Sequence, residues 1–440
     1  MATQICGTSE KLSSYRSVPV FTGSMFSGSR GALALLVFGV LLFAVAFGCG
    51  SGQGSSNPAS NPAATSGGNT IAAPANNVHP ISISAGPNFV VTTVTVCVPG
   101  GGSCVDVPNV LVDTGSFGLR ILASALPGLA LPQSSLAGGP LAECVQFIDN
   151  SLVWGSVRRA DVKMAGETAS SIPIHLIGDS GFANIPASCG TAANAHDSAQ
   201  TLGSNGILGI GFFVHDCGQN CVVNANAGQY FVCPTPATCA STAVTLADQV
   251  QNPVALFAGP DNNGTILELP AVPASGQGSV TGSLVFGIGT QSNNGLGGAT
   301  VLKADASGNF TTRYNGQSFP LSFLDSGSNA IYFLDAATTG FPTCSNTGRF
   351  GPAVVNFYCP GGSQTLSATH VGSNGAISNF SFVVANGEAE FSTGSEALGN
   401  IGGPHPGNFD WGLPFFFGRN IFTAIEGANT PVGAGPFWAY

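Results

Sequence analysis

Short apolar runs separated by turn-forming residues dominate the chain from residue 79 onward. Residues 88–98 (NFVVTTVTVCV) are rich in Val and Thr and end at a Pro/Gly run, which is typical of a β-strand. Residues 144–148 and 152–157 form two apolar runs joined by Asp-Asn-Ser, which predicts a β-hairpin. Further strands are expected near 158–164, 172–177, 281–288, 301–314 and 377–392. The pattern therefore predicts an all-β fold.

Helical periodicity is scarce in this chain. One short helix is predicted at 245–251, where it would stop before Pro253. The 440 residues include 62 Gly and 28 Pro, and 44% are hydrophobic while only 7% are charged. This composition is typical of a turn-rich β-protein whose surface is covered mainly by uncharged polar groups. The length suffices for two domains or for one domain with two lobes.

The N-terminal segment has the pattern of an export signal. Basic residues precede the uncharged apolar run 31–48, and Cys49 follows it, which predicts a signal at 1–48. The preceding Ala-Phe-Gly and Cys49 together resemble a bacterial lipobox, in which the cysteine becomes the lipid-bearing first residue of the mature chain. An ordinary signal peptide and a single membrane anchor are the alternatives. Each places the rest of the chain outside the cytoplasm, because no other apolar run could span a bilayer.

The remaining boundaries follow from composition. Residues 49–78 carry no charge and no core-forming pattern, so they predict a flexible tether. The Gly/Asn-rich stretch 289–298 is the best candidate for a boundary between lobes, so an N-terminal lobe is expected at 79–292 and a C-terminal lobe at 293–440. We expect a monomer, exported as a lipoprotein to the outer membrane, periplasm or cell surface. The net charge of −10 and the lack of a basic patch argue against nucleic acid as a partner.

Cysteine usage agrees with export. Of the 12 cysteines, Cys6 and Cys49 fall in the N-terminal segment, which leaves 10. Eight of these lie close together in pairs, namely Cys97/Cys104, Cys217/Cys221, Cys233/Cys239 and Cys344/Cys359. Such spacings favour small disulfide-closed loops in an oxidising compartment. The alternative is a structural zinc site made by the four cysteines between 217 and 239, although no Cys-x-x-Cys pair is present.

One short motif occurs twice, each time at the end of an apolar strand. The copies lie in 109–116 and 321–328, and their aspartates are 212 residues apart (325 − 113). The two motifs read Asp113-Thr114-Gly115-Ser116 and Asp325-Ser326-Gly327-Ser328. A single Asp-x-Gly is usually a plain turn. Two copies, each framed by strands and separated by the length of a lobe, predict a paired site.

Two carboxyls pressed together share one proton near neutral pH, because both cannot easily ionise. With a water between Asp113 and Asp325, one carboxylate can remove the proton of the water while the other acid donates to a carbonyl oxygen. The neighbours have supporting roles: Gly115 and Gly327 allow the loops to approach, Thr114 and Ser326 can bond to backbone across the interface, and Ser116 and Ser328 can donate to the carboxylates.

The chain resembles the pepsin-like, two-lobed aspartic peptidases over about residues 79–426. Besides the two motifs, the resemblance is carried in family order by 204–212 (SNGILGIGF), 282–287 (GSLVFG), 314–317 (YNGQ) and 411–426 (WGLPFFFGRNIFTAIE). It implies a cleft between two β-rich lobes, Asp113 and Asp325 as the catalytic pair, an extended polypeptide as substrate, and neither cofactor nor metal.

The chain also departs from that family. The hairpin that covers the catalytic pair, called the flap, usually carries a Tyr, and here Phe147 or, as second choice, Trp154 takes its place. Arg120 stands near the position of a usual Trp, and Pro414 stands at that of a usual Asp. A non-catalytic surface protein that binds ligands or has a structural role on the same scaffold is therefore the alternative. The motifs of serine hydrolases and zinc peptidases are missing.

Overall fold

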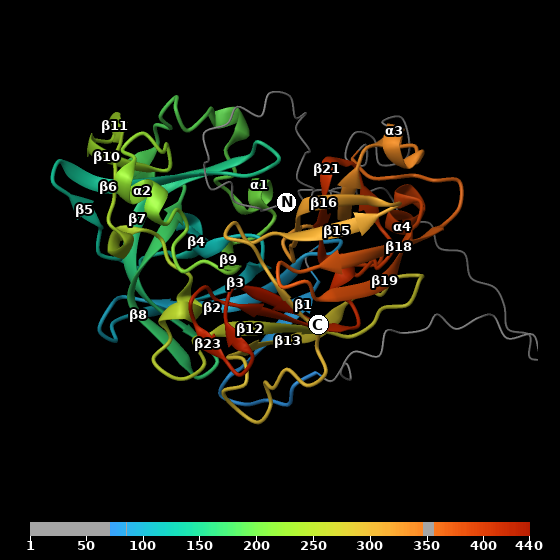
Figure 1. Ribbon diagram of the computed structural model, residues 1–440. Helices are drawn as coiled ribbons and strands as arrows, with labels where there is room; N and C mark the ends of the chain where they lie inside the picture. Colours follow the sequence, from blue (N-terminus) through green and yellow to red (C-terminus); the bar gives the residue numbers. More distant parts are fainter. Residues whose placement is uncertain (1–70, 85, 346–355) are drawn as a thin grey trace, which may run out of the picture. The chain divides into compact units, whose positions relative to one another are not determined.

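The computed structural model describes residues 71–84, 86–345 and 356–440 (Figure 1). All of them belong to one compact unit of the chain. The expectations for the signal at 1–48, for Cys49 and for the tether up to residue 70 lie outside the described residues. Within the described ranges, no helix is long and apolar enough to cross a membrane.

A sixteen-stranded sheet contains the strands before residue 290, one short strand at 301–303 and two strands from the end of the chain. In sheet order its strands are β11 (Thr238–Ser241), β10 (Tyr230–Thr235), β6 (Gly139–Gln146), β7 (Leu152–Met164), β8 (Glu167–Ile177), β4 (Phe117–Leu122), β9 (Gly206–Ile210), β3 (Cys104–Asp113), β2 (Val90–Cys97), β1 (Val78–Ile83), β13 (Val280–Phe286), β12 (Gly264–Leu269), β22 (Arg419–Ala424), β25 (Phe437–Ala439) and β14 (Val301–Lys303), with β5 (Ser135–Leu136) paired to β6. The lobe boundary at 292/293 stays a prediction.

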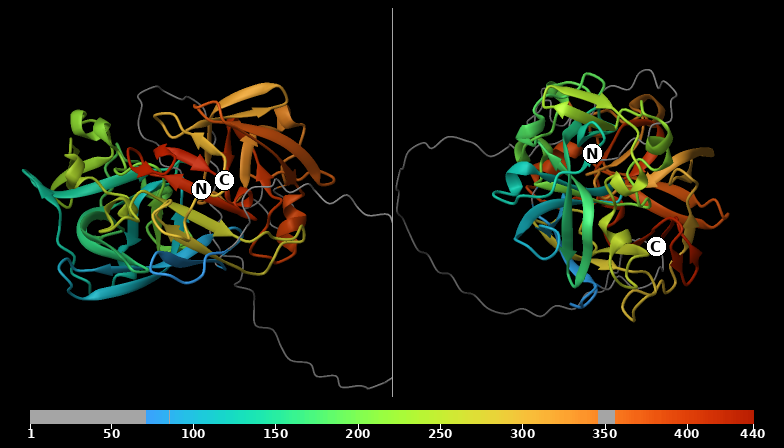
Figure 2. Two further views of the ribbon diagram at one scale, coloured as in Figure 1. Left: turned by 60° about the horizontal axis from the view of Figure 1, so that its bottom comes forward. Right: turned by 90° about the vertical axis from the view of Figure 1, so that its left-hand side faces the viewer.

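A seven-stranded sheet is built from the second half (Figures 1 and 2). Its order is β19 (Ile377–Val384), β18 (Gln364–Val371), β15 (Phe310–Tyr314), β16 (Gln317–Leu324), β21 (His405–Trp411), β17 (Ile331–Leu334) and β20 (Gly402–Gly403). A small ribbon of β23 (Asn429–Thr430) and β24 (Gly433–Ala434) stands apart from both sheets. The all-β fold class is confirmed.

The α-helices of the described residues are short: α1 (Ala199–Leu202), α2 (Gln219–Val223), α3 (Ala336–Thr339) and α4 (Gly387–Ser392). The expected helix at 245–251 is wrong, since only Leu246–Asp248 makes a single 3-10 turn. The chain beyond it is extended and bonds to other segments instead, for example through Asp216 N to Val250 O at 3.2 Å. The strand expected near 377–392 ends at Val384, and α4 follows because the Asn386 side chain caps it.

The strands around the two aspartates repeat one arrangement. β3 leads into the first aspartate and runs parallel to β9, while β4 leaves it and runs antiparallel to β9. In the second half β16 runs parallel to β21, while β17 runs antiparallel to β21. Each half therefore presents its aspartate on a loop with the same three-strand support, as the expected two-lobed architecture requires.

Close approach of backbone in these units depends on glycine. A Cβ on Gly209 of β9 would lie 2.6 Å from Phe117 N, and one on Gly412, just after β21, would lie 2.1 Å from Ala330 O. Real Cβ atoms do not approach backbone so closely, so only glycine fits at either place. Glycine therefore lets neighbouring backbones pack closely behind both loops.

Five disulfides link the cysteines of the described residues: Cys97–Cys104, Cys144–Cys189, Cys217–Cys221, Cys233–Cys239 and Cys344–Cys359. The four close pairs are as expected. Because Cys217, Cys221, Cys233 and Cys239 are all oxidised, they offer no thiolates to a zinc ion. The additional bridge, Cys144–Cys189, ties β6 to the segment that follows β8.

The bridges differ in the length of chain they close, which gives a test. Cys144–Cys189 spans 45 residues and Cys217–Cys221 spans 4, and both pairs are buried. Loop-closure entropy predicts a loss of about 4 kcal/mol in the free energy of unfolding for the Cys144→Ala/Cys189→Ala double variant, and about 2 kcal/mol for Cys217→Ala/Cys221→Ala. Urea unfolding of the oxidised variants measures both. Equal losses would show that loop length is not what sets their contributions.

Candidate functional site

The two aspartate loops meet and bond reciprocally. Thr114 Oγ1 donates to Leu324 O at 3.1 Å, and Ser326 Oγ donates to Val112 O at 2.7 Å. The backbone N–H of Ser326 donates to Thr114 Oγ1 at 2.9 Å, and that of Thr114 donates to Ser326 Oγ at 3.1 Å. Each hydroxyl thus satisfies a buried donor and a buried acceptor of the other loop, and this fixes the two loops relative to one another.

Glycine follows each of these hydroxyl residues because the opposite carboxyl is too near for a side chain. A Cβ on Gly115 would lie 2.7 Å from Asp325 Cγ and Oδ1. A Cβ on Gly327 would lie 2.7 Å from Asp113 Oδ1. The loops therefore bring the two carboxyls together across their interface, as the repeated motif predicted.

Each carboxyl is fully buried and receives the same two donors from its own loop. The bonds are Gly115 N to Asp113 Oδ1 (2.8 Å), Ser116 Oγ to Asp113 Oδ2 (2.5 Å), Gly327 N to Asp325 Oδ1 (2.8 Å) and Ser328 Oγ to Asp325 Oδ2 (2.8 Å). Both serines make the contacts expected of them. Donors to both oxygens hold each carboxyl in one orientation, so that its chemistry depends on the other carboxyl of the pair.

The electrostatics of the pair favour a shared proton. Burial is the main cause that raises the pKa of Asp113 well above its usual range, and the negative charge of Asp325 raises it further. The bonds from Ser116 and from Gly115 N act in the opposite direction. Burial and mutual repulsion therefore favour a pair that holds one proton and carries one negative charge.

The β6–β7 hairpin carries both of the aromatic residues considered for the flap. Phe147 lies at the turn, where its N–H donates to Ser151 O at 2.9 Å, and its ring is buried in a cluster with Phe89 and Val145. Trp154 lies further along β7 in a different cluster, and its indole N–H donates to Phe182 O at 2.6 Å. Only Phe147 is at the hairpin turn, and its role as a flap residue stays a prediction.

Arg120, noted only as a departure from the family pattern, lies in a buried ion network. Its Nη2 is 3.0 Å from Glu143 Oε1 and 2.9 Å from Asp216 Oδ2, with all three side chains fully buried. Tyr230 donates to Asp216 Oδ1 at 2.6 Å, and His175 Nδ1 lies 3.1 Å from Glu143 Oε2. The network joins β4, which leaves the first aspartate, to β6 of the hairpin. The charge inside the apolar run FGLRIL was its only sequence signal.

The charges of this network are balanced by pKa shifts. Burial opposes ionisation of Glu143, but the Arg120 guanidinium, together with His175 and hydrogen bonds from neighbouring side chains, outweighs burial and lowers the pKa of Glu143 to about 2. Burial and the charge of Glu143 raise the pKa of Asp216 well above its usual range. Burial lowers the pKa of His175 to about 4. Near neutral pH the cluster therefore holds one cation and one anion, which limits the cost of burying it.

A third carboxyl beside the pair was missed by sequence reasoning. Asp410 on β21 is fully buried, and its Oδ2 lies 2.8 Å from Ser328 Oγ. Burial, followed by the charge of Asp325, raises the pKa of Asp410 well above its usual range. An acidic residue inside the aromatic run Phe409-Asp410-Trp411 is the signal that could have found it, because a buried acid needs a polar partner.

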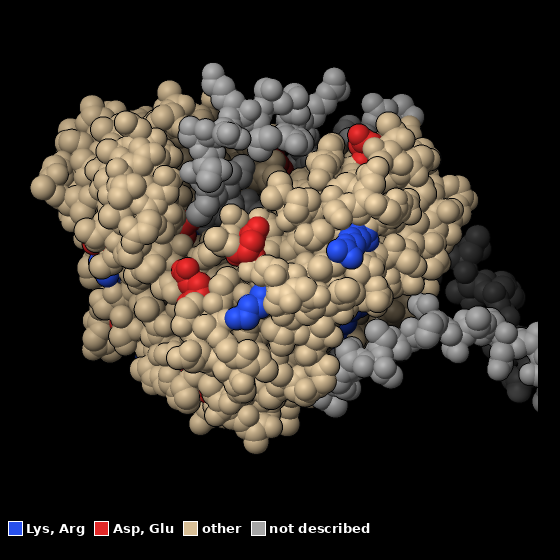
Figure 3. Space-filling view, viewed as in Figure 1, with Lys and Arg blue, Asp and Glu red and all other residues tan. Residues whose placement is uncertain are grey.

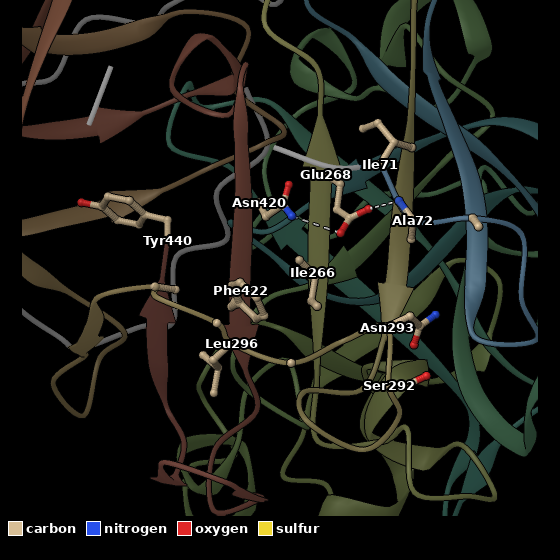
Figure 4. A pocket seen from close by; sticks show the side chains of 14 residues that line it. Ile71, Ala72, Ile266, Glu268, Ser292, Asn293, Leu296, Asn420, Phe422 and Tyr440 are labelled. Atoms are coloured by element: carbon tan, nitrogen blue, oxygen red, sulfur yellow. Dashed lines mark hydrogen bonds between the residues drawn. The ribbon is translucent and has the colours of Figure 1, made fainter. Parts of the chain in front are cut away.

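Other parts of the described chain offer weaker candidates. A pocket of about 460 Å³ lies over β12 and β22 (Figure 4), and none of its lining residues belongs to an aspartate loop. Its carboxylate, Glu268, already accepts from Ala72 N at 2.6 Å and from Asn420 Nδ2 at 3.3 Å. Figure 3 shows only scattered charges on one face rather than a patch. No cluster of three or more potential metal ligands occurs in the described ranges.

The reciprocal bonds between the loops can be tested by an isosteric substitution. Thr114→Val keeps the shape of the side chain but leaves Leu324 O and Ser326 N–H buried without their partner. The expected loss is about 2–4 kcal/mol in the free energy of unfolding, measured in urea. Thr114→Ser keeps the hydroxyl and is expected to lose only about 1 kcal/mol. Similar losses for the two variants would show that the hydroxyl does not hold the loops together.

Two of three comparisons with known proteins find similar proteins. Among solved structures, the chain is similar to the crystal structure of an aspartic proteinase from Irpex lacteus, with 16% identity, 82% of this chain and 96% of that chain covered, and a TM-score of 0.46. A search of curated proteins finds no match. The sequence model of the family described as "Protein of unknown function (DUF3443)" matches residues 73–440. Because this match spans most of the sequence, the chain belongs to the DUF3443 family.

Proposed function

We propose that the protein is an aspartic endopeptidase that hydrolyses peptide bonds with Asp113 and Asp325. The observation that supports this proposal is the matched pair of buried carboxyls, each with an N–H donor and a serine hydroxyl donor from its own loop. A plain turn needs only one such carboxyl. Two of them, placed close enough for one to raise the pKa of the other, form a general acid/base pair.

The proposed mechanism follows from the proton on Asp113. Ionised Asp325 accepts a proton from a water molecule as its oxygen attacks the carbonyl carbon of the peptide, while Asp113 donates its proton to the carbonyl oxygen. The tetrahedral product is a gem-diol, and the pair now carries its proton on Asp325. Asp325 then gives this proton to the amide nitrogen as the C–N bond breaks, and Asp113 recovers a proton from the gem-diol. The aspartates end as they began.

The proposed substrate is an extended polypeptide lying across the two aspartate loops, and the proposed setting is outside the cytoplasm. Five disulfides support an oxidising compartment. Export by the segment 1–48, attachment to a membrane through lipid on Cys49, and a monomeric state rest on the sequence and complete the proposal.

The alternative is a surface protein that binds ligands or has a structural role on the same scaffold without catalysis. Its support is Phe147, which lies at the hairpin turn with its ring packed among apolar side chains and which has no hydroxyl to offer a substrate. The matched donors around both aspartates argue against it, because a binding surface does not require two equivalent carboxyl cradles.

Single substitutions of the pair separate these possibilities. Asp113→Asn and Asp325→Asn keep the shape of the carboxyls but remove the acid and the base, so each is expected to lower kcat/KM on unfolded protein by at least about 100-fold. Asp106→Asn, at an exposed aspartate of β3, is the matched control and should retain the parent rate. Unfolding curves would establish that all variants are folded. Parent-like cleavage by both dyad variants would remove Asp113 and Asp325 from the mechanism.

The pH dependence gives an independent test. The raised pKa of Asp113 means that its acid form dominates at low pH and is lost only as the pH rises through that raised value. Hydrolysis measured from about pH 3 to about pH 8 should therefore fall along an alkaline limb set by loss of the Asp113 proton. The stability that this proton contributes to the folded state is likewise present at acidic pH and lost on the alkaline side. Activity that rises steadily towards about pH 8 would contradict the assignment.

A further inference from the structure

One serine hydroxyl lies between two buried carboxyls. Ser328 Oγ is 2.8 Å from Asp325 Oδ2 and 2.8 Å from Asp410 Oδ2. A hydroxyl has a single proton, so it can donate to only one of these oxygens. The other contact is a hydrogen bond only if that carboxyl is protonated and donates to Ser328 Oγ. The geometry therefore requires one of the two carboxyls to be an acid.

This arrangement breaks the symmetry of the site. In the first loop, the described contacts of the Ser116 hydroxyl consist of one bond, to Asp113 Oδ2. In the second loop, Ser328 has the extra contact with Asp410. Because the donors around Asp113 and Asp325 otherwise match, Asp410 distinguishes one member of the pair from the other.

The surroundings of Asp410 favour its protonated form. The residue is fully buried on β21, opposite Phe323 of β16 and Tyr332 of β17. The titratable groups that face it are Asp325, Asp113 and Tyr332. The Tyr332 hydroxyl donates to Asn329 Oδ1 at 2.7 Å, so its proton is already used.

An ionised Asp410 would be poorly compensated. Its Oδ1 has no hydrogen-bond partner among the described residues, and its Oδ2 has the contact with Ser328 alone. A fully buried carboxylate with one donor, next to two other carboxyls, carries a large desolvation and repulsion cost. A neutral acid that donates to Ser328 avoids both costs.

We propose that Asp410 is a positioning residue that, in its protonated form, donates to Ser328 Oγ and so directs the Ser328 hydroxyl to Asp325 Oδ2, making Asp325 the ionised member of the pair. This inference rests on the proposed function. Asp410 touches neither water nor substrate in this scheme, and it acts only through Ser328. When Asp410 gains or loses its proton, only an O–H bond forms or breaks.

The proposal implies a second titration in the activity. When the pH rises far enough for Asp410 to ionise, the Ser328 hydroxyl turns to the new carboxylate. Asp325 then loses a donor that held its carboxylate in place and faces an additional negative charge, so the arrangement proposed for catalysis is lost. The alkaline limb of the pH profile therefore contains a contribution from Asp410 as well as from Asp113.

Two substitutions of Asp410 test this with opposite expectations. In Asp410→Asn the amide N–H donates to Ser328 as the neutral acid does, so kcat at acidic pH should stay near that of the parent, and the alkaline limb should move up by about one pH unit. In Asp410→Ala this donor is lost, and kcat should fall about tenfold with little change in KM. Asp106→Asn again controls for removal of an acid elsewhere. Identical kcat values and pH profiles for the parent and both variants would overturn the proposal while leaving the proposed function intact.

A stability measurement decides the protonation of Asp410 without reference to activity. If Asp410 in the folded protein keeps its proton at pH values above the pKa that it has in the unfolded chain, this proton stabilises the folded parent at low pH. The stabilisation is lost as the pH rises. The Tm of the parent should therefore fall relative to that of Asp410→Asn between about pH 4 and about pH 8. A Tm difference that is constant with pH would show that Asp410 is not held protonated. A parent that cleaves no peptide at any pH would overturn the proposed function and the positioning role with it.

Discussion

The reciprocal hydrogen bonds between Thr114 and Ser326 are the constraint on which the site depends. These bonds take the place of hydrogen bonds to water for two N–H groups and two carbonyl groups that are buried where the loops meet. With the loops fixed in this way, the opposite carboxyls come so close that only glycine fits at 115 and 327. The proximity of the carboxyls, which adds to the effect of burial on the pKa of Asp113, is therefore a consequence of backbone contacts rather than of attraction between the aspartates.

Buried charge is concentrated near this constraint in a chain with few charged residues. The Arg120 network on β4 and β6 is nearly neutral because Glu143 pairs with the guanidinium while Asp216 keeps its proton. The three carboxyls of the site, Asp113, Asp325 and Asp410, also carry little net charge, because the raised pKa values of Asp113 and Asp410 favour their acid forms. Both clusters adjoin the strands that carry the aspartate loops, so charge balance and the geometry of the site are coupled.

The sequence predicted what is encoded locally. The two motifs, their flanking strands, the hairpin around 149 and the close cysteine pairs each depend on neighbouring residues, and each is present. Asp410 and the partners of Arg120 could not be predicted, because their contacts join residues 82, 23 and 96 positions apart. The helix expected at 245–251 failed for the same reason, since its backbone bonds to other segments of the chain instead. Local pattern thus located the aspartates, and tertiary contact decided their environment.

Binding of a peptide mimic with a hydroxyl group in place of the scissile carbonyl tests the central claim most directly. Such a ligand imitates the tetrahedral intermediate and requires one ionised and one protonated carboxyl, whatever the natural substrate is. Calorimetry at acidic pH should show binding to the parent that is at least about 100-fold tighter than binding to folded Asp113→Asn. Equal affinity for the two proteins would show that Asp113 and Asp325 do not act as a catalytic pair.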